Sequence, residues 1–330
     1  MRRTENLKQF INQMVIGMSH FFDDQIFDGS PVQFEEVVRY CEHNFEIDLT
    51  QSVLRGFPGD YHTLDIEIFF YSRRRTQQLP IDEIGIIVAQ MLLGQDLFQK
   101  WVGTLHSDYR TLAAKQDGLP HVELNSLPKI MNGFKRNIQQ KLCERPLYIV
   151  EERLEASALV SPEYHHPEPG QKPQIGTVFE IESPEAENYP AQSDLVVASA
   201  RFDYLWLAMH SDVPFYSCRF SKCEEIFCYL KIDGRDGFAE TLVSDRTDIE
   251  EALNEVLVAN GLGCAISGGT GRVYSYIDLA ITDLPRAIKS IREVVQSLRL
   301  TKRTWLQYFD ADKTSEWEVM YIDSPPPPAS

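Results

Sequence analysis

The last third of the sequence alternates between the hydrophobic periods of strands and helices, and this alternation is its strongest constraint on the fold. Residues 225–232 and 272–281 place apolar side chains at every second position, as a strand with one buried face does. Helical stripes begin at Ile249 and at Leu284. Further strands are expected at residues 264–267, 304–309 and 316–322. From about residue 224, the order βαββαβ with an added strand therefore predicts a ferredoxin-like domain, in which two helices cover one face of an antiparallel sheet.

Local signals mark the ends of these elements. Thr247 and Glu250 have the spacing of a capping box, and Asp283 is placed to cap the second helix. The Gly-Gly-Thr-Gly sequence at residues 268–271 predicts a hairpin turn, because glycine adopts positive φ without strain. The same loop superficially resembles a phosphate-binding turn. It lacks the lysine and the following helix of a true phosphate loop, so the hairpin is the preferred interpretation.

The first 160 residues predict a mainly helical domain with few strands. Residues 64–70 alternate as a single clear strand. Helical spacing of apolar side chains is found at residues 7–22, 34–41, 81–94, 97–105 and 127–142.

A proline-rich segment separates this region from the rest. Residues 161–173 hold four prolines and no aliphatic side chain, the composition of a linker or long surface loop. A chain of 330 residues exceeds one ordinary core, so two domains are expected. The predicted organisation is 1–160 helical, 161–173 linker, 174–323 α+β and 324–330 a proline-rich tail.

Composition and charge exclude several classes of protein. A hydrophobic fraction of 43% is that of a globular chain. The formal net charge of −17 disfavours nucleic acid as a partner, because phosphate contacts need clustered positive charge. The sequence holds no secretory leader and no apolar run long enough to cross a bilayer. With six scattered cysteines, these features predict a soluble cytoplasmic protein with reduced thiols and no membrane partner.

No motif in the sequence assigns a chemical reaction, so whether the protein is an enzyme stays open. Neither a nucleophile elbow, a zinc-protease helix nor a nucleotide phosphate loop occurs. Cys218, Cys223 and Cys228 are five residues apart, whereas structural zinc pairs use shorter spacings and come with a second pair. Neither a metal nor a cofactor is expected.

The most specific expectation concerns the sheet face opposite the two helices. Alternation directs Tyr229, Tyr274, Tyr276 and Asp278 to that face, with Arg272 at the preceding turn. Two interpretations remain open. The face is covered by the first domain or by residues 174–215, or these five residues form a site for a ligand or a partner.

The function expected from these observations is that of a non-catalytic protein-interaction or ligand-binding protein. The alternative is an enzyme that acts on a small polar molecule, with Arg272, Tyr276 and Asp278 lining a pocket at the domain junction. The partner is accordingly another protein or a small molecule.

Overall fold

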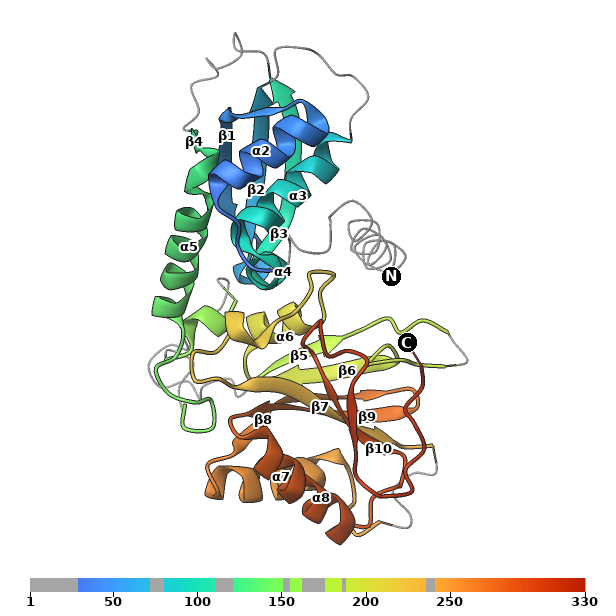
Figure 1. Cartoon of the computed structure of the whole chain (residues 1–330). Helices are drawn as coiled ribbons and strands as arrows, with labels where there is room; N and C mark the ends of the chain where they lie inside the picture. Colours follow the sequence, from blue (N-terminus) through green and yellow to red (C-terminus); the bar gives the residue numbers. More distant parts are fainter. Residues whose placement is uncertain are drawn as a thin grey trace. The chain divides into compact units, whose positions relative to one another are not determined.

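A computed structural model describes residues 29–71, 80–110, 121–150, 155–161, 176–185, 188–235 and 241–329. The chain divides into two compact units, Met1–Gln140 and Lys141–Ser330 (Figure 1). Within the described ranges, no helix is long and apolar enough to cross a bilayer.

The first unit is built on a four-stranded mixed sheet with the order β3-β2-β1-β4. β2 pairs antiparallel with β1 and parallel with β3. The helices α2 and α3 contact the sheet through β1 and β3, and α5 adds apolar side chains to the same core. The elements of this unit are α2 (Phe34–Phe45), β1 (Asp48–Pro58), η1 (Asp60–His62), β2 (Leu64–Tyr71), α3 (Ile81–Leu93), α4 (Gln95–Trp101), β3 (Val102–Arg110), β4 (Val122–Glu123), η3 (Leu124–Ser126) and α5 (Leu127–Lys141).

The prediction of a mainly helical first domain is wrong, because this unit is built on a four-stranded mixed sheet as well as on its helices. β1 escapes recognition since a register shift between Asp48 and Val53 breaks its alternation. β3 pairs with β2 and carries mostly polar residues, so the predicted helix over residues 97–105 ends at Trp101 and continues as a strand. The helix predicted at residues 7–22 lies outside the described residues.

The second unit contains a seven-stranded antiparallel sheet with the order β11-β10-β7-β9-β8-β6-β5. The predicted βαββαβ connectivity runs through β10-β7-β9-β8, but three further strands extend this sheet, so the fold is larger than the predicted module with one added strand. Its elements are η4 (Ser157–Leu159), β5 (Thr177–Glu180), β6 (Leu195–Ala200), α6 (Asp203–Met209), η5 (Ser217–Arg219), β7 (Ile226–Asp233), α7 (Arg246–Ala259), β8 (Gly263–Gly271), β9 (Tyr274–Ile281), α8 (Leu284–Ser297), β10 (Thr304–Tyr308) and β11 (Trp317–Val319).

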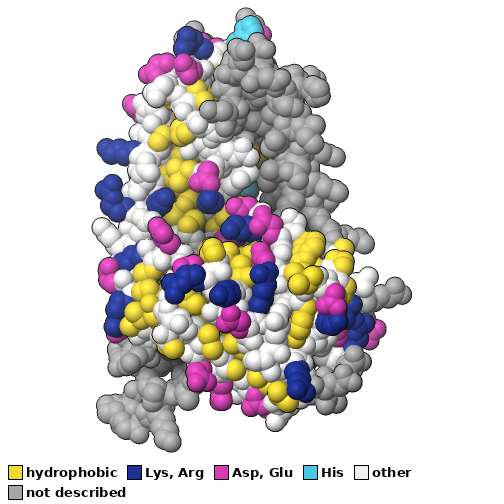
Figure 2. Space-filling model, turned by 60° about the horizontal axis from the view of Figure 1, so that its bottom comes forward, with side chains coloured by type: hydrophobic (Ala, Val, Ile, Leu, Met, Phe, Trp, Pro, Cys, Tyr) yellow, Lys and Arg dark blue, Asp and Glu magenta, His cyan; other side chains and the backbone are white. Residues whose placement is uncertain are grey.

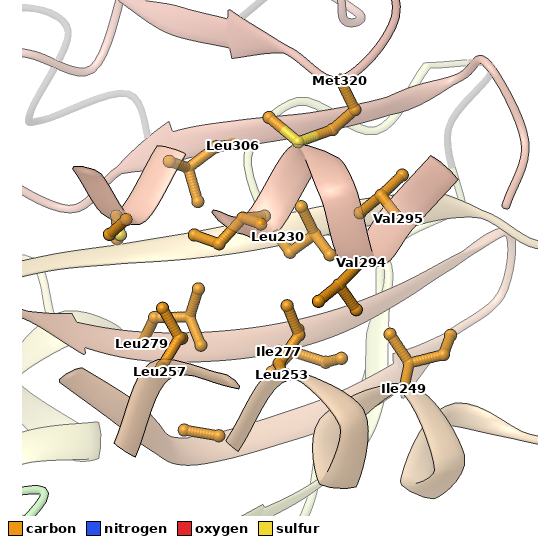
Figure 3. Close-up of a cluster of buried hydrophobic side chains, with 14 of the residues drawn as sticks. Leu230, Ile249, Leu253, Leu257, Ile277, Leu279, Val294, Val295, Leu306 and Met320 are labelled. Atoms are coloured by element: carbon orange, nitrogen blue, oxygen red, sulfur yellow. The ribbon is translucent and has the colours of Figure 1, made fainter. Parts of the chain in front are cut away.

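The helices α7 and α8 cover one face of this sheet and bury a continuous aliphatic core (Figure 3). Ile277 and Leu279 of β9 point into it, as their alternation predicts, and both are fully buried. Facing them are Leu253 from α7 and Val295 from α8. Burial of the apolar stripes of the two helices against this face offsets the conformational entropy that the helices lose on folding.

Two local predictions in this unit need correction. The N-cap of α7 is Asp245, whose carboxylate accepts hydrogen bonds from the N–H groups of Thr247 and Asp248, rather than a capping box starting at Thr247. The glycines at 268 and 269 lie inside β8 rather than in a hairpin turn. A Cβ on Gly269 would lie 2.7 Å from the carbonyl oxygen of Val197 in β6, so glycine permits the close approach of that strand.

Residues 141–161 belong to the second unit. The N–H of Leu147 donates to the buried carboxylate of Glu225 over 2.7 Å, and that of Ser161 donates to Asp203 over 2.6 Å. The division between the units therefore falls at residue 140, ahead of the predicted linker. Residues 162–173 of that linker lie outside the described residues.

Candidate functional site

The sheet face opposite α7 and α8 carries rows of polar and aromatic side chains. Strand register aligns Gln307, Tyr229, Asp278 and Ser267 across β10, β7, β9 and β8. The adjacent row contains Trp305, Lys231 and Tyr276. A face this polar is unusual for the interior of a sheet, so its hydrogen bonds decide what it can do.

This face is covered, and the cover comes from the same unit. Tyr229 and Tyr274 are 4% and 5% exposed, and Tyr276 and Asp278 are 0% and 1% exposed. Residues 189–210 lie against the face. The side chain of Gln192 and the backbone oxygen of Tyr189 hydrogen-bond to it, and Trp206 of α6 stacks on Phe179 of β5. One of the two predicted interpretations, cover by residues 174–215, therefore describes the structure. Arg272 is separated from the other four: it is exposed and donates to the carbonyl oxygen of Ser183.

Asp194 fixes the covering segment to β9. Its Oδ2 accepts hydrogen bonds from the N–H groups of Val273 and Tyr274 at 2.7 and 2.9 Å, and its Oδ1 accepts the phenolic hydrogen of Tyr276. Burial, reinforced by this carboxylate, raises the pKa of Tyr276 far above its ordinary value. The hydroxyl therefore stays protonated and acts as a structural donor.

A second chain of hydrogen bonds runs from Asp278 to the imidazole of His210. Ser267 Oγ donates to one oxygen of Asp278 over 2.7 Å, and Gln192 Nε2 donates to the other over 2.7 Å. The side-chain oxygen of Gln192 lies 3.1 Å from His210 Nε2, and the carbonyl oxygen of Trp206 lies 2.9 Å from Nδ1. Burial lowers the pKa of His210, and the Asp278 carboxylate opposes that shift.

Lys231 is the third anchor and is fully buried. Its ammonium donates to the carbonyl oxygens of Tyr189 and Ala191 at 2.5 and 2.7 Å and lies 4.2 Å from the ring centroid of Tyr274. Burial lowers its pKa to about 8, against the opposing attraction of Asp194. Lysine here binds the covering segment through two backbone oxygens, and its desolvation is compensated by these contacts.

The acids, bases and hydroxyl on this face resemble the components of a catalytic site, but their bonds are made within the chain. Asp278, His210 and Ser267 each form a hydrogen bond with a neighbouring protein group. Asp278 and Ser267 are buried, and His210 is partly buried. The arrangement can hold the residue 189–210 segment in one position. Reaction with a substrate would require that segment to leave.

Sequence reasoning did not single out Gln192, Asp194, His210 or Lys231 as members of this network. Strand alternation placed Lys231 on the correct face, beside Tyr229. Gln192 and Asp194 lie on irregular chain and His210 directly follows the short helix α6, so no period indicates their direction. Only the fold brings Gln192 and Asp194 into hydrogen-bond contact with β9, and His210 joins the network through Gln192.

The three spaced cysteines do not come together as a ligand set. Cys228 is buried in the aliphatic core, where burial raises its pKa, whereas Cys218 is exposed. In the described part of the chain, no group of three or more His, Cys, Asp or Glu side chains is placed to hold a metal ion. Gly268 and Gly269, considered above as part of a phosphate-binding turn, are paired with β6 on one side and with β9 on the other. They therefore form part of a central strand rather than a turn.

Three of the apolar side chains that this unit exposes lie on the last two strands at one edge of its sheet. Val178 of β5 is 66% exposed, and Val196 and Val197 of β6 are also exposed; we call these three residues the β5 edge patch. Within the described residues, β5 pairs only with β6 and is the last strand of the sheet. An outermost strand has unpaired backbone N–H and C=O groups and can accept a further strand.

Charge is mixed on the face that the space-filling view shows. On the face that Figure 2 shows, basic and acidic side chains lie side by side, and hydrophobic side chains form several separate groups. Around the β5 edge patch the sequence is acidic, because Glu180, Glu182 and Glu185 are exposed there.

Comparison with known proteins gives no relative to reason from. No family model matches the chain, and neither a curated protein nor a solved structure matches it significantly.

Proposed function

We propose that this protein is a non-catalytic interaction protein of the cytoplasm, which binds an extended segment of another protein along β5. The observation that carries the proposal is the 66% exposure of Val178 on the outermost strand of the sheet. An added strand bonds to the backbone of such an edge and places alternate side chains against its apolar residues.

The chemistry of the partner follows from what surrounds the strand. Val178 pairs with Ser199, and Glu180 pairs with Val197, so the two valines lie diagonally on one face of the β5–β6 pair. Glu180, Glu182 and Glu185 add negative charge beside them. A segment with alternating apolar and basic residues is complementary to both features, and its binding should weaken as salt screens the charges.

The covered face supports the same assignment. The residues that a ligand-binding protein or an enzyme would use already contact residues of the same unit. Tyr274, Tyr276 and Asp278 form hydrogen bonds, and the ring of Tyr229 packs against that of Tyr276. Ligand binding there would have to replace those contacts, whereas β5 is open to a partner in the described structure.

The proposal is tested with the double variant Val178→Lys/Val197→Lys. Partners are captured on the immobilised wild-type chain, identified, purified and titrated against both chains. We expect the affinity for the authentic partner to fall at least about tenfold, because two apolar contacts become charged. Leu242→Lys is the matched control, since Leu242 is 63% exposed elsewhere in the unit and its replacement should leave binding unchanged.

Two results would contradict the proposal. One is a purified partner that binds the double variant and the wild type equally. The other is a metabolite that raises the stability of the chain: a ligand at 100 times its Kd adds about 2.7 kcal/mol, and such a result would favour the small-molecule alternative.

A further inference from the structure

The proline-rich end of the chain lies on the sheet at Trp305 of β10. The indole Nε1 of Trp305 donates a hydrogen bond of 2.6 Å to the carbonyl oxygen of Pro325. Trp305 is on the face opposite α7 and α8, in the row of Lys231 and Tyr276, and is fully buried. The tail thus makes a specific polar contact with one of the largest buried side chains of the unit.

The exposure of the tail follows the period of a polyproline II helix. Pro326 and Ala329, three residues apart, are exposed, whereas Pro325, Pro327 and Pro328 are partly buried. A polyproline II helix has three residues per turn, so positions three apart lie on the same side. Residues 325 and 328 therefore contact the protein while 326 and 329 face solvent, and the segment has no helix or strand within its described residues.

The side chains around Trp305, which the tail contacts, have the composition that recognises such helices. The ring of Tyr274 lies 6.4 Å from that of Trp305 at an angle of 61°, and the guanidinium of Arg303 lies 5.5 Å from the Trp305 ring centroid. Aromatic rings bind the proline rings, and a fixed N–H donor binds a backbone oxygen that polyproline leaves without an internal partner. Trp305, Tyr274 and Arg303 form what we call the Trp305 seat.

The tail is held at its base but not by sheet pairing. Lys302 forms an ion pair with Asp323, and the N–H of Ser324 donates to the carbonyl oxygen of Tyr321 over 3.2 Å. The last described strand, β11, ends at Val319. Residues 325–329 can therefore leave the seat without breaking any strand pair of the described structure.

We propose that the Trp305 seat is a binding site for proline-rich segments in the polyproline II conformation, and that the chain's own tail occupies it as an intramolecular ligand. The occupant that replaces the tail is a proline-rich segment of another protein, which enters when the tail leaves. This site lies on β10 and is independent of the binding proposed for β5.

The test uses a chain that ends at Ser324 and a synthetic peptide with the tail sequence SPPPPAS. We expect saturable binding of the peptide to the shortened chain, followed through the indole N–H resonance of Trp305 in ¹⁵N-labelled protein. The full-length chain should bind the peptide at least about tenfold more weakly, because a tethered tail competes at an effective concentration in the millimolar range. The peptide SAAAAAS should not bind.

A pair of variants assigns the contact. Trp305→Phe in the shortened chain removes the indole donor, so its binding is measured by titration calorimetry rather than by that resonance. We expect peptide binding to weaken at least about tenfold, whereas Trp317→Phe, on the partly exposed β11, should leave it unchanged. If the shortened chain does not fold, the full-length chain with glycine at all four positions 325–328 takes its place, because glycine cannot maintain the polyproline conformation.

Three outcomes would overturn the proposal. They are no saturable binding of SPPPPAS to the chain with its tail removed or replaced, equal binding of SAAAAAS, and equal affinity for the Trp305→Phe and unsubstituted chains. The first would mean that the tail only covers Trp305.

Discussion

Asp194 accounts for a sequence feature that residue patterns alone misassign. Its carboxylate lies so close to β8 that a Cβ on Gly271 would be 2.5 Å from it. Together with the approach of β6 to Gly269, this explains the glycine-rich run as a strand crossed closely by its neighbours. From the sequence, a glycine at these positions indicates either flexibility or a close approach by another group. It does not indicate which group approaches, because Asp194 lies nearly 80 positions before Gly271.

Removing the hydroxyl of Tyr276 should destabilise the second unit. Tyr276→Phe leaves one oxygen of the fully buried Asp194 without its donor, so we expect the free energy of unfolding to fall by about 1–3 kcal/mol in urea titrations. Tyr274→Phe is the matched control, since its hydroxyl meets Arg303 only at 3.5 Å and should contribute less than about 1 kcal/mol. Equal losses in the two variants would contradict the assignment of Asp194 as the anchor.

The buried thiols give the protein a predictable response to alkaline pH. Burial raises the pKa of Cys41 and of Cys264 to about 12, and raises that of Cys228 as well. An unfolded thiol ionises near pH ~8.5. Stability from each thiol is therefore complete below about pH 8.5 and is lost as the pH rises toward the folded pKa, by about 1.4 kcal/mol per pH unit.

Cys228→Ala isolates one of these contributions. Between pH 9 and 10, in the presence of a reductant, the free energy of unfolding of the variant should fall less steeply than that of the wild type, by about 1.4 kcal/mol per pH unit. Lys231 acts in the opposite direction above its pKa of about 8, because the unfolded chain then binds more protons, but its contribution is common to both proteins and cancels. Parallel pH profiles would show that Cys228 ionises in the folded state.

Among the elements, β9 is the strand on which the second unit depends. It pairs with both β7 and β8 and is buried on both faces, with the aliphatic core on one side and the polar network on the other. A substitution there cannot be relieved by exposure to water, so its cost reflects the cavity that it leaves.

Leu279→Ala should lower the free energy of unfolding by about 2–5 kcal/mol, because the fully buried side chain contacts strands and helices that cannot collapse into the space. Urea denaturation measures the change. Leu242→Ala, at a position 63% exposed, should change stability by less than about 0.5 kcal/mol. A small effect at Leu279 would mean that the strand register is different.

The elements that the sequence could predict are those with an uninterrupted hydrophobic period. α8 follows its N-cap Asp283 and has a complete apolar stripe, and β9 alternates without interruption. β1 could not be recognised across its register shift. β5 and β6 are short strands that pair with each other, and β8, the other partner of β6, lies far along the chain. The candidate site was predictable in the same measure: strand periodicity found Tyr229, Tyr276 and Asp278, but the residues that cover them come from irregular segments.

At the scale of the whole molecule, the second unit begins at Lys141, earlier than the second domain predicted from the sequence. The second includes residues 141–161, from which Leu147, Val150 and Leu159 are buried, and Leu147 supplies a donor to the buried Glu225. A fragment that starts at the predicted boundary, near residue 174, would lose all of these contacts.

Two fragments test this description. Residues 141–330 should unfold cooperatively in urea. Residues 174–330 should be less stable by more than about 1–3 kcal/mol, since Glu225 loses a hydrogen bond and apolar surface becomes exposed. Coincident urea midpoints would show that residues 141–161 contribute nothing to the fold of the second unit.

The order of strands in the large sheet also determines when each strand pair can form during synthesis. β6 leaves the ribosome about 70 residues before β8, the strand to which it bonds, and β5 bonds only to β6 within the described residues. At a translation rate of about 5–20 residues per second, β8 is synthesised roughly 4–14 s after β6. During that interval we expect Val178, Val196 and Val197 to be exposed on the nascent chain, because β8, which bonds to β6 in the finished sheet, has not yet been made.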